Sequence, residues 1–253
     1  MSNNEEKMMR LQKYLSSAGV CSRRESEKYI TEGRVTINGK VAVLGDKVYK
    51  SDKIVFDGKE LSLCNKKYII LNKPENVICS RKDERGRKTV FDLLVGEDRT
   101  DTSLFHIGRL DYNSCGLILL TNDGDFANNI IHPSKSVVKG YMVTSSASIE
   151  VAKNIAASFT RGITVDKVFY KAKMCQIQQD KKKMLIELKE GKKREIREVY
   201  KHFACEIIKL ERIFIGKLRL ADLNIQPGEY VSMSYDEIYD AIYNNGVKKC
   251  KLQ

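Results

Sequence analysis

The hydrophobic pattern begins with two short helical segments. Apolar residues recur at helical spacing between residues 11 and 18, and Gly19 can end that helix. Ser22 followed by Glu25 is typical of a capped helix start, and it predicts a second helix that runs to about Glu32.

Alternating apolar and polar residues follow these segments. Residues 35–37 and 54–56 both alternate, and each run is followed by a tight-turn pair, Asn38-Gly39 and Asp57-Gly58. Such pairs are strong hairpin signals because they accept the backbone conformation of a two-residue turn. Two helices and a few short strands therefore predict a small domain over residues 8–63.

From residue 68 the pattern predicts a larger α+β domain, which we assign to residues 64–245. The apolar runs YIIL, LILL and MLIEL predict strands. Predicted helices cover residues 148–159 and 196–203, and an earlier one starts at Asp123 or Asp125 and ends before Pro133. Ser234 with Glu237 predicts the cap of a final helix.

The charge balance indicates the kind of partner. The 253 residues carry a formal net charge of +12 and have a pI near 9.3. This predicts a polyanionic partner without separating RNA from DNA or an acidic membrane. No apolar run approaches the roughly 20 residues of a membrane span, and the first ten residues lack the apolar core of a signal peptide. We therefore expect no membrane association.

The cysteines and histidines do not predict a metal site. The seven cysteines are scattered and never form a CxxC pair, and the three histidines are widely separated. This pattern fits neither a disulfide framework nor a zinc site, so we expect a protein of the reducing cytoplasm without a bound metal.

The stretch HIGRLDYNSCGLILLTNDG, residues 106–124, places a carboxylate beside a buried strand. Asp111 lies between Arg109 and Asn113 in a short polar loop that precedes the apolar run. One interpretation is a reactive side chain presented at a sheet edge. The other is an aspartate that only caps a turn. The tetrapeptide GRLD alone does not decide between them.

Basic residues gather at two further places. The loop SRKDERGRKT carries five basic residues against two acidic ones. Lys192, Lys193 and Arg194 crowd the start of the helix predicted over residues 196–203, where the helix dipole disfavours cations unless an anion lies nearby. These cations indicate a phosphate or carboxylate partner, and exposed charge without a partner is the alternative.

Five motifs, taken in order, resemble those of ribosomal RNA pseudouridine synthases of the RsuA type. RLQKYLSSAGVCSRRESEKYITEGRVTINGKVAVLGDKV resembles the S4 RNA-binding domain, and NKP with the basic loop before TVFDLL resembles the first synthase motif. GRLD with Ser114 and GLILLTNDG resembles the catalytic motif. KGYMV and GKKREIREV resemble the KxYxV and GxxRQVRRM motifs. The chain departs from the family at Asn76, Glu195 and Glu198, where Gly, Gln and Arg are usual.

The resemblance implies an N-terminal S4 module followed by a synthase domain with a mixed, largely antiparallel sheet and flanking helices. It implies that Asp111 is the nucleophile or base, that Tyr141 stacks on the target uracil, and that Arg197 pairs with Asp111. The residues expected to contact RNA are Arg10, Lys13, Ser22, Arg23, Arg24, Lys73, Arg81, Arg87, Arg109, Lys192 and Arg194.

The implied reaction converts uridine to pseudouridine in ribosomal RNA without a cofactor. The expected substrate is a uridine-containing stem-loop or a pre-ribosomal particle, and the expected enzyme is a monomer. Overall resemblance favours large-subunit (23S) RNA over small-subunit (16S) RNA. A non-catalytic RNA-binding ribosome-assembly factor is the alternative from another class. Whether Asp111 attacks C1′ or removes the 2′ proton stays open.

Overall fold

The computed structural model describes residues 8–179 and 182–247 and divides into two compact units. The first unit extends to Lys66 and also includes Gly96–Phe105. The second starts at Lys67 and takes in the rest of the chain. The segment Gly96–Phe105 thus clusters with the first unit, although the sequence pattern assigned it to the second domain.

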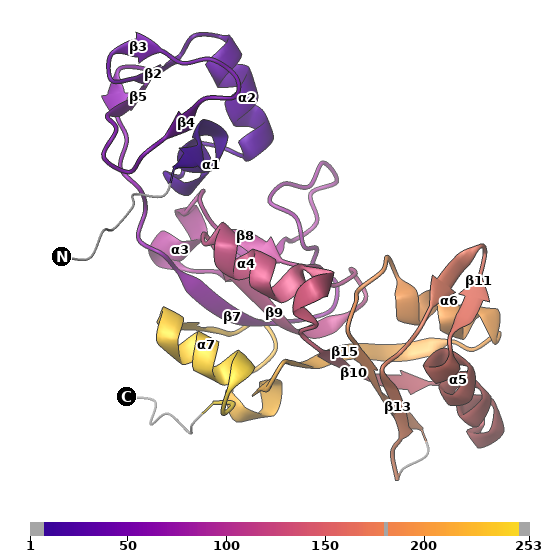
Figure 1. The fold of residues 1–253 in the computed structure, drawn as a ribbon. Coiled ribbons are helices and arrows are strands. Elements are labelled where there is room, and N and C mark those ends of the chain that lie inside the picture. The colour runs from indigo at the N-terminus through magenta and orange to yellow at the C-terminus, as the bar shows by residue number, and fades with distance from the viewer. Residues whose placement is uncertain (1–7, 180–181, 248–253) are drawn as a thin grey trace. The chain divides into compact units, whose positions relative to one another are not determined.

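Two helices and two small sheets form the main part of the first unit (Figure 1). Helix α1 spans Leu11–Ser17, and α2 spans Arg23–Thr31. The Ser22 hydroxyl accepts a hydrogen bond from the backbone N–H of Glu25, so the predicted cap forms. One sheet pairs β1 (Met9–Arg10) with β4 (Lys47–Val48), and the other has the order β3 (Lys40–Val41), β2 (Val35–Ile37), β5 (Ile54–Phe56) and β6 (Lys59–Glu60).

The predicted hairpin turns and a closed core hold this unit together. Asn38 and Asp57 adopt φ values of 50° and 48°, as tight turns require. The later segment of the unit carries α3 (Gly96–Thr100), and the hydroxyl of Thr102 donates to the carbonyl of Gly19 at 2.6 Å. The buried core is formed by Leu11, Tyr14, Leu15, Ile30, Val35, Ala42, Val48 and Ile54.

A nine-stranded sheet is the frame of the second unit. Its strands are β7 (Tyr68–Lys73), β8 (Phe105–Ile107), β9 (Cys115–Thr121), β10 (Lys139–Ser145), β13 (Met174–Ile177), β14 (Lys183–Leu188), β15 (Ile207–Ile215), β16 (Leu218–Arg219) and β17 (Tyr230–Met233). The order is β13-β14-β10-β15-β9-β7-β17, with β16 beside β15 and β8 beside β9. Along this order only β15 and β9 are parallel. The predicted α+β class and largely antiparallel sheet are confirmed.

Helices pack at both ends of this sheet (Figure 1). The helices are α4 (Gly124–Ile131), α5 (Ile149–Arg161), α6 (Glu195–His202) and α7 (Tyr235–Tyr243), with 3₁₀ turns at Val90–Leu93, Pro133–Lys135 and Leu220–Asp222. Helix α5 contacts β13 and α6. The Asp123 carboxylate caps α4 by accepting from the N–H groups of Asp125 and Phe126, which decides between the two predicted caps. Ser234 and Glu237 form the predicted capping box of α7.

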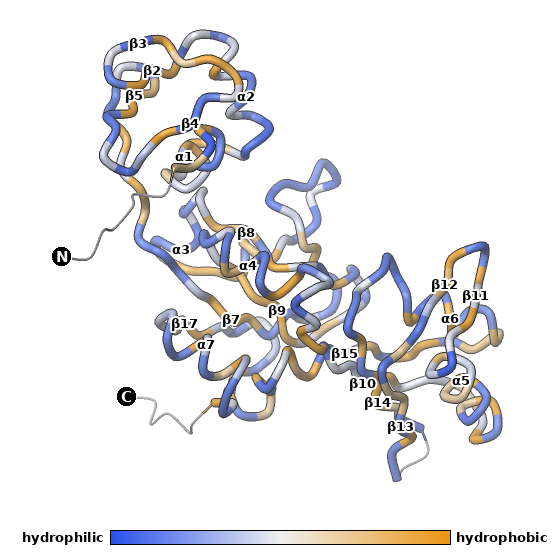
Figure 2. The backbone as a smooth tube through the Cα atoms, in the orientation of Figure 1, coloured by the Kyte–Doolittle hydropathy of each residue, from blue (hydrophilic) through white to orange (hydrophobic). Residues whose placement is uncertain are grey.

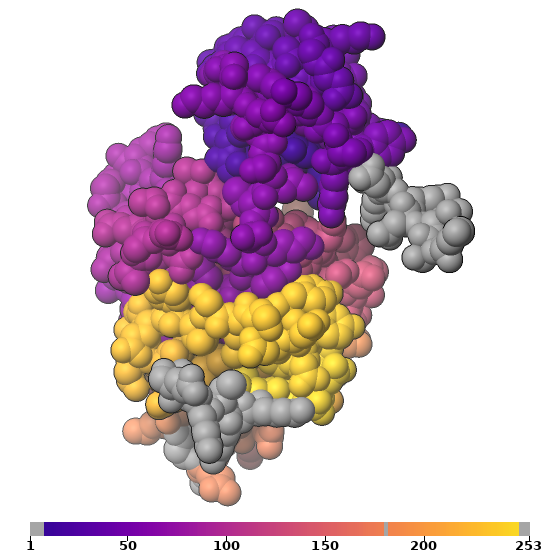
Figure 3. Space-filling view, turned by 90° about the vertical axis from the view of Figure 1, so that its left-hand side faces the viewer, coloured from indigo at the N-terminus to yellow at the C-terminus, as the bar shows by residue number. Residues whose placement is uncertain are grey.

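The core of the second unit follows its central strands. Every residue of β7 and β9 is buried, and Figure 2 draws most of these strands in hydrophobic colours, with blue loops around them. Tyr235 of α7 packs against Tyr68 of β7 with ring centroids 5.7 Å apart. Helix α7 and the segment before it form the yellow surface in Figure 3. Within the described ranges, no helix is both long and apolar enough to cross a membrane.

A hairpin absent from the sequence prediction precedes β13. Strands β11 (Ile163–Val165) and β12 (Val168–Tyr170) are joined by Asp166 and Lys167, which both take left-handed φ values, 47° and 66°. This turn contains no glycine, so the usual hairpin signal is missing.

Candidate active site

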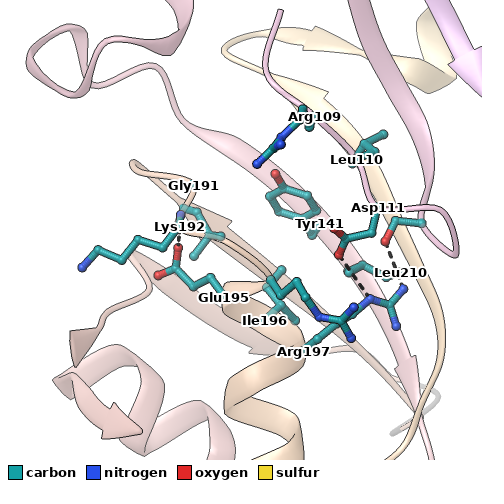
Figure 4. Close-up of a pocket in the computed structure, with 13 residues that line it drawn as sticks. Arg109, Leu110, Asp111, Tyr141, Gly191, Lys192, Glu195, Ile196, Arg197 and Leu210 are labelled. Atoms are coloured by element: carbon teal, nitrogen blue, oxygen red, sulfur yellow. Dashed lines mark hydrogen bonds and ion pairs between the residues drawn. The ribbon is translucent and has the colours of Figure 1, made fainter. Parts of the chain in front are cut away.

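A pocket in the second unit joins the loop before β9, strand β10 and the start of α6 (Figure 4). Its walls include Arg109, Asp111, Tyr141 and Arg197, residues that are up to 88 positions apart in the chain. It holds about 480 Å³ of space, part of which is open solvent.

The loop of residues 109–114, here the Asp111 loop, is fastened to its neighbours by main-chain contacts. The N–H of Asn76 donates to the carbonyl of Tyr112 at 2.9 Å, and the N–H of Leu110 donates to the Cys79 sulfur at 3.3 Å. Asn76 has φ 62°, so asparagine sustains the turn at which the family usually has glycine. Anchoring on both sides of Asp111 keeps the carboxylate in one place.

Lys73 supports the same loop from beneath. Its side chain is fully buried, and its ammonium donates to the carbonyls of Ser114 at 2.7 Å and Pro74 at 2.9 Å. Burial lowers the pKa of Lys73 below its ordinary value. The ammonium has no exposed surface in this structure, so the burial of Lys73 gives no support to its predicted contact with RNA, which stays a prediction.

Arg197 joins the start of α6 to the Asp111 loop. Its guanidinium donates to the carbonyl of Asn113 at 2.8 Å and to the Ser114 hydroxyl at 3.0 Å, and its Nε lies 3.6 Å from Oδ2 of Asp111. Burial lowers the pKa of Arg197, and the charge of Asp111 opposes that shift. The side chain of Arg197 is only 16% exposed, whereas that of Asp111 is 41% exposed. The carboxylate is thus held from one side and open on the other.

Tyr141 forms a wall of the pocket from the middle of β10. The residue is 9% exposed, and Figure 4 shows the ring beside Asp111 with the phenol end directed toward Arg109. The structure therefore brings together Asp111, Tyr141 and Arg197, the three residues predicted to carry the chemistry.

One row across the sheet supports this group. Tyr141 of β10 pairs in register with Arg212 of β15, Arg212 pairs with Gly116 of β9, and Gly116 pairs with Lys73 of β7. A Cβ at Gly116 would lie 2.3 Å from the carbonyl oxygen of Arg212, so no larger residue fits there without displacing a strand. The row thus places two buried cations, Lys73 and Arg212, on either side of β9, the strand that follows the Asp111 loop.

Arg212, which is buried, and Lys139, which is half-buried, are cations near the site that the sequence reasoning missed. Arg212 is 3% exposed, and its Nε donates to the carbonyl of Leu117 at 2.6 Å. One of its terminal nitrogens has no hydrogen-bond partner among the described residues. Burial, together with the charge of Arg212, lowers the pKa of Lys139 to about 8. The available signal for Arg212 was its place directly before the apolar residues 213–215, in a strand that also contains Lys209 and Glu211.

The start of α6 explains two departures from the family pattern. Glu195 is buried, and its carboxylate accepts from the backbone N–H of Lys192 at 3.0 Å. Burial raises the pKa of Glu195. Glu198 pairs with Arg194 at 3.5 Å. Both glutamates therefore have partners within this segment.

The other residues predicted to bind RNA lie in both units. Arg109, Lys192 and Arg194 are exposed at the pocket. In the basic loop, Arg87 pairs with Asp83 at 2.7 Å, and Arg81 lies over the ring of Phe91. In the first unit, Arg10, Ser22, Arg23 and Arg24 are exposed and Lys13 is half-buried.

The described residues contain no cluster of three or more histidine, cysteine, aspartate or glutamate side chains with the geometry to hold a metal ion. The six cysteines in this part of the chain are free thiols.

Comparisons with known proteins agree with this architecture. The family described as RNA pseudouridylate synthase matches residues 67–204, and the S4 domain matches residues 9–54. An "Uncharacterized RNA pseudouridine synthase" of Borreliella burgdorferi is 40% identical, over 86% of this chain and 87% of that protein. "Ribosomal large subunit pseudouridine synthase B" of Bacillus subtilis is 37% identical, over 86% of this chain and 89% of that protein. A crystal structure of a pseudouridylate synthase superposes with a TM-score of 0.65 and 27% identity, over 91% of this chain and 98% of that one.

Proposed function

Because the chain belongs to the RNA pseudouridylate synthase family and carries an S4 domain, we propose that it modifies ribosomal RNA, and specifically the large-subunit RNA. The family assigns the enzyme class: the protein is a pseudouridine synthase, an isomerase. The choice of subunit is supported by the Bacillus subtilis relative, whose name specifies the large subunit.

The observation that carries the proposed chemistry is a pocket in which Asp111, Tyr141 and Arg197 converge. Isomerisation breaks the C1′–N1 bond of uridine and forms a C1′–C5 bond; C5 loses a proton and N1 gains one, so no atom is gained or lost overall. Asp111 acts on the ribose, either by attacking C1′ or by removing the 2′ proton. Both routes require a carboxylate with an accessible oxygen, and Asp111 is half-exposed.

Arg197 acts as the orienting partner of that carboxylate. Its two hydrogen bonds to the Asp111 loop fix the guanidinium before substrate arrives. The ion pair then holds Asp111 from the interior side and leaves its open side for the ribose.

Tyr141 provides the platform for the target base. A uridine must leave its stack to reach Asp111, which costs a few kcal/mol. Stacking on an aromatic ring returns ~1–3 kcal/mol per base. Tyr141 lies beside Asp111 on a strand paired on both sides, so the platform is rigid.

RNA is held mainly through phosphate contacts from exposed cations. Arg109 lies exposed at the pocket, and Arg23 and Arg24 lie exposed at the start of α2 in the S4 unit. A single chain supplies every residue of the proposed chemistry, which supports a monomeric enzyme. Its ribosomal RNA substrate supports a cytoplasmic location.

Mapping pseudouridines in ribosomal RNA with and without this gene tests the proposal. We expect at least one pseudouridine of the large-subunit RNA to disappear on deletion, and to return with the wild-type gene but not with Asp111→Asn. Loss confined to the small-subunit RNA would contradict the choice of subunit. An unchanged map of both RNAs would contradict ribosomal RNA as the substrate.

A further inference from the structure

A second hollow adjoins the pocket of Asp111, between the hairpin β11–β12 and the start of α6. It holds about 760 Å³ of space, part of it open solvent. Lys192 and Arg194 line both this hollow and the pocket, so the two lie next to each other. A chain that passes through the pocket can therefore extend into the hollow.

The hairpin is fastened to the start of α6, so the hollow has a fixed shape. The ammonium of Lys192 donates to the carbonyl of Phe169 at 2.7 Å, and Figure 4 shows this side chain directed away from Asp111. The ring of Phe169 in turn covers Gly162, where a Cβ would lie 2.3 Å from the ring. Lys192 is thus used to hold the hairpin.

The two sides of the hollow differ in chemistry. On the hairpin side, Val168 lines the hollow and is 41% exposed. On the helix side, the ammonium of Lys193 makes no hydrogen bond or ion pair with any described residue, and Arg194 has only the 3.5 Å contact with Glu198. Carboxylates line both sides of the hollow: Asp166, at the hairpin turn, disfavours a phosphate on its own side, whereas Glu198 on the helix side is paired with Arg194. A nucleotide matches this arrangement, with its base against Val168 and its phosphate near Lys193.

We infer that this hollow binds one nucleotide adjacent to the target uridine on the same RNA strand, with its base on Val168 and its phosphate at Lys193 and Arg194. The inference rests on the proposed function, since it takes the occupant of the neighbouring pocket to be a uridine of RNA. It adds a second point of recognition beside the flipped base, and this point fixes the direction of the strand through the site.

A double-variant cycle tests the contact with the base. Dissociation constants are measured for wild type and Val168→Ser on a substrate fragment and on fragments with an abasic nucleotide immediately before or after the target. We expect an abasic nucleotide on one side of the target to weaken RNA binding by wild type by at least about threefold, as the loss of one or two buried methyl groups would. Binding by Val168→Ser should be nearly unaffected by the same abasic nucleotide. Equal losses in both proteins at both positions would overturn the inference. Val168 is exposed, and equal melting temperatures would show that the variant folds normally.

Charge reversal tests the contact with the phosphate. Lys193→Glu should weaken binding by about tenfold at low salt. Lys153→Glu makes the same change at an exposed position of α5 that lines neither hollow nor pocket, and it should have an effect below about twofold. Equal effects of the two reversals would overturn the phosphate contact. Pseudouridine formation is scored on the same samples: a wild type that binds with the expected coupling but makes no pseudouridine would contradict the proposed function and not this binding site.

Discussion

At the start of α2, Arg23 and Arg24 are exposed to solvent, whereas around the Asp111 loop Lys73 and Arg197 are largely buried and donate to backbone carbonyls. Residues of the same charge thus have different surroundings in the two units. Exposed cations attract phosphate over a distance set by salt, and one of them is easily replaced by another. Buried cations bind one or two oxygen atoms at fixed distances, so their effect is on geometry.

This comparison separates affinity from rate. The exposed cations should determine how tightly RNA binds. The buried cations should determine how well Asp111 is positioned once RNA is bound. A variant in either region should therefore change one quantity and leave the other nearly unchanged. The four variants below run from the largest expected effect to the smallest.

Asp111→Asn should lower the single-turnover rate of pseudouridine formation by at least about 10⁴-fold, because an amide is neither a nucleophile nor a useful base here. RNA affinity should stay within a few-fold of wild type, since many phosphate contacts contribute to it. The assay is conversion of ribosomal RNA already shown to be bound. Near-normal conversion would remove Asp111 from the mechanism.

Lys73→Met should lower the same rate by about 10- to 100-fold, because the Asp111 loop loses the hydrogen bond from Lys73 to the Ser114 carbonyl that holds it from beneath. Its RNA affinity and salt dependence should match wild type. Lys82→Met is the matched control, since Lys82 is exposed in the nearby basic loop. If Lys73→Met instead weakened binding and left the rate unchanged, Lys73 would belong with the exposed cations.

Replacing Arg23 and Arg24 together by alanine should weaken RNA binding by about tenfold at low salt and reduce the log–log salt slope by roughly 0.7–0.9 for each lost phosphate contact. The rate at saturating RNA should not change, because neither side chain lies in the pocket. Lys28→Ala, on the same helix and paired with Glu32 at 3.7 Å, is the control. A salt slope equal to that of wild type would show that α2 does not contact phosphate.

Glu195→Gln should raise the free energy of unfolding at neutral pH by a few tenths to about 1 kcal/mol, because glutamine can still accept from Lys192 and carries no buried charge. Burial raises the pKa of Glu195, so the folded state binds a proton more readily than the unfolded state. The destabilisation from ionised Glu195 is therefore full at neutral pH and is lost as the pH falls through the raised pKa. Denaturation of wild type and Glu195→Gln at several pH values measures the difference between their free energies of unfolding. This difference should shrink toward acid pH, and a difference that grew toward acid pH would contradict the prediction.

The sequence by itself determined the elements whose causes are local. Ser22 and Ser234 cap their helices because a side-chain oxygen lies within reach of the next N–H groups, and the same rule limited the cap of α4 to Asp123 or Asp125. Asn38 and Asp57 form their turns because few other residues accept positive φ. These effects depend on neighbours within four residues, so a pattern in the sequence is enough to predict them.

The sequence also predicted Asp111, Tyr141 and Arg197 as a group, through resemblance to a family, and the structure places them around one pocket. The residues alone left Asp111 with two interpretations. Only the fold shows that its carboxylate is open on one side and paired on the other. That arrangement depends on α6, which lies more than 80 residues further along the chain.

Tertiary structure alone decided which charged residues are interior. Lys73 follows an apolar run and was predicted to contact RNA, but both faces of β7 are covered. Arg212 and Gly116 share a row only because β15 crosses to lie parallel to β9, and the close approach of the two strands then excludes a side chain at residue 116. The burial of a cation is set by strands that are distant in sequence, and the free energy that decides it comes from their packing, which no local pattern contains.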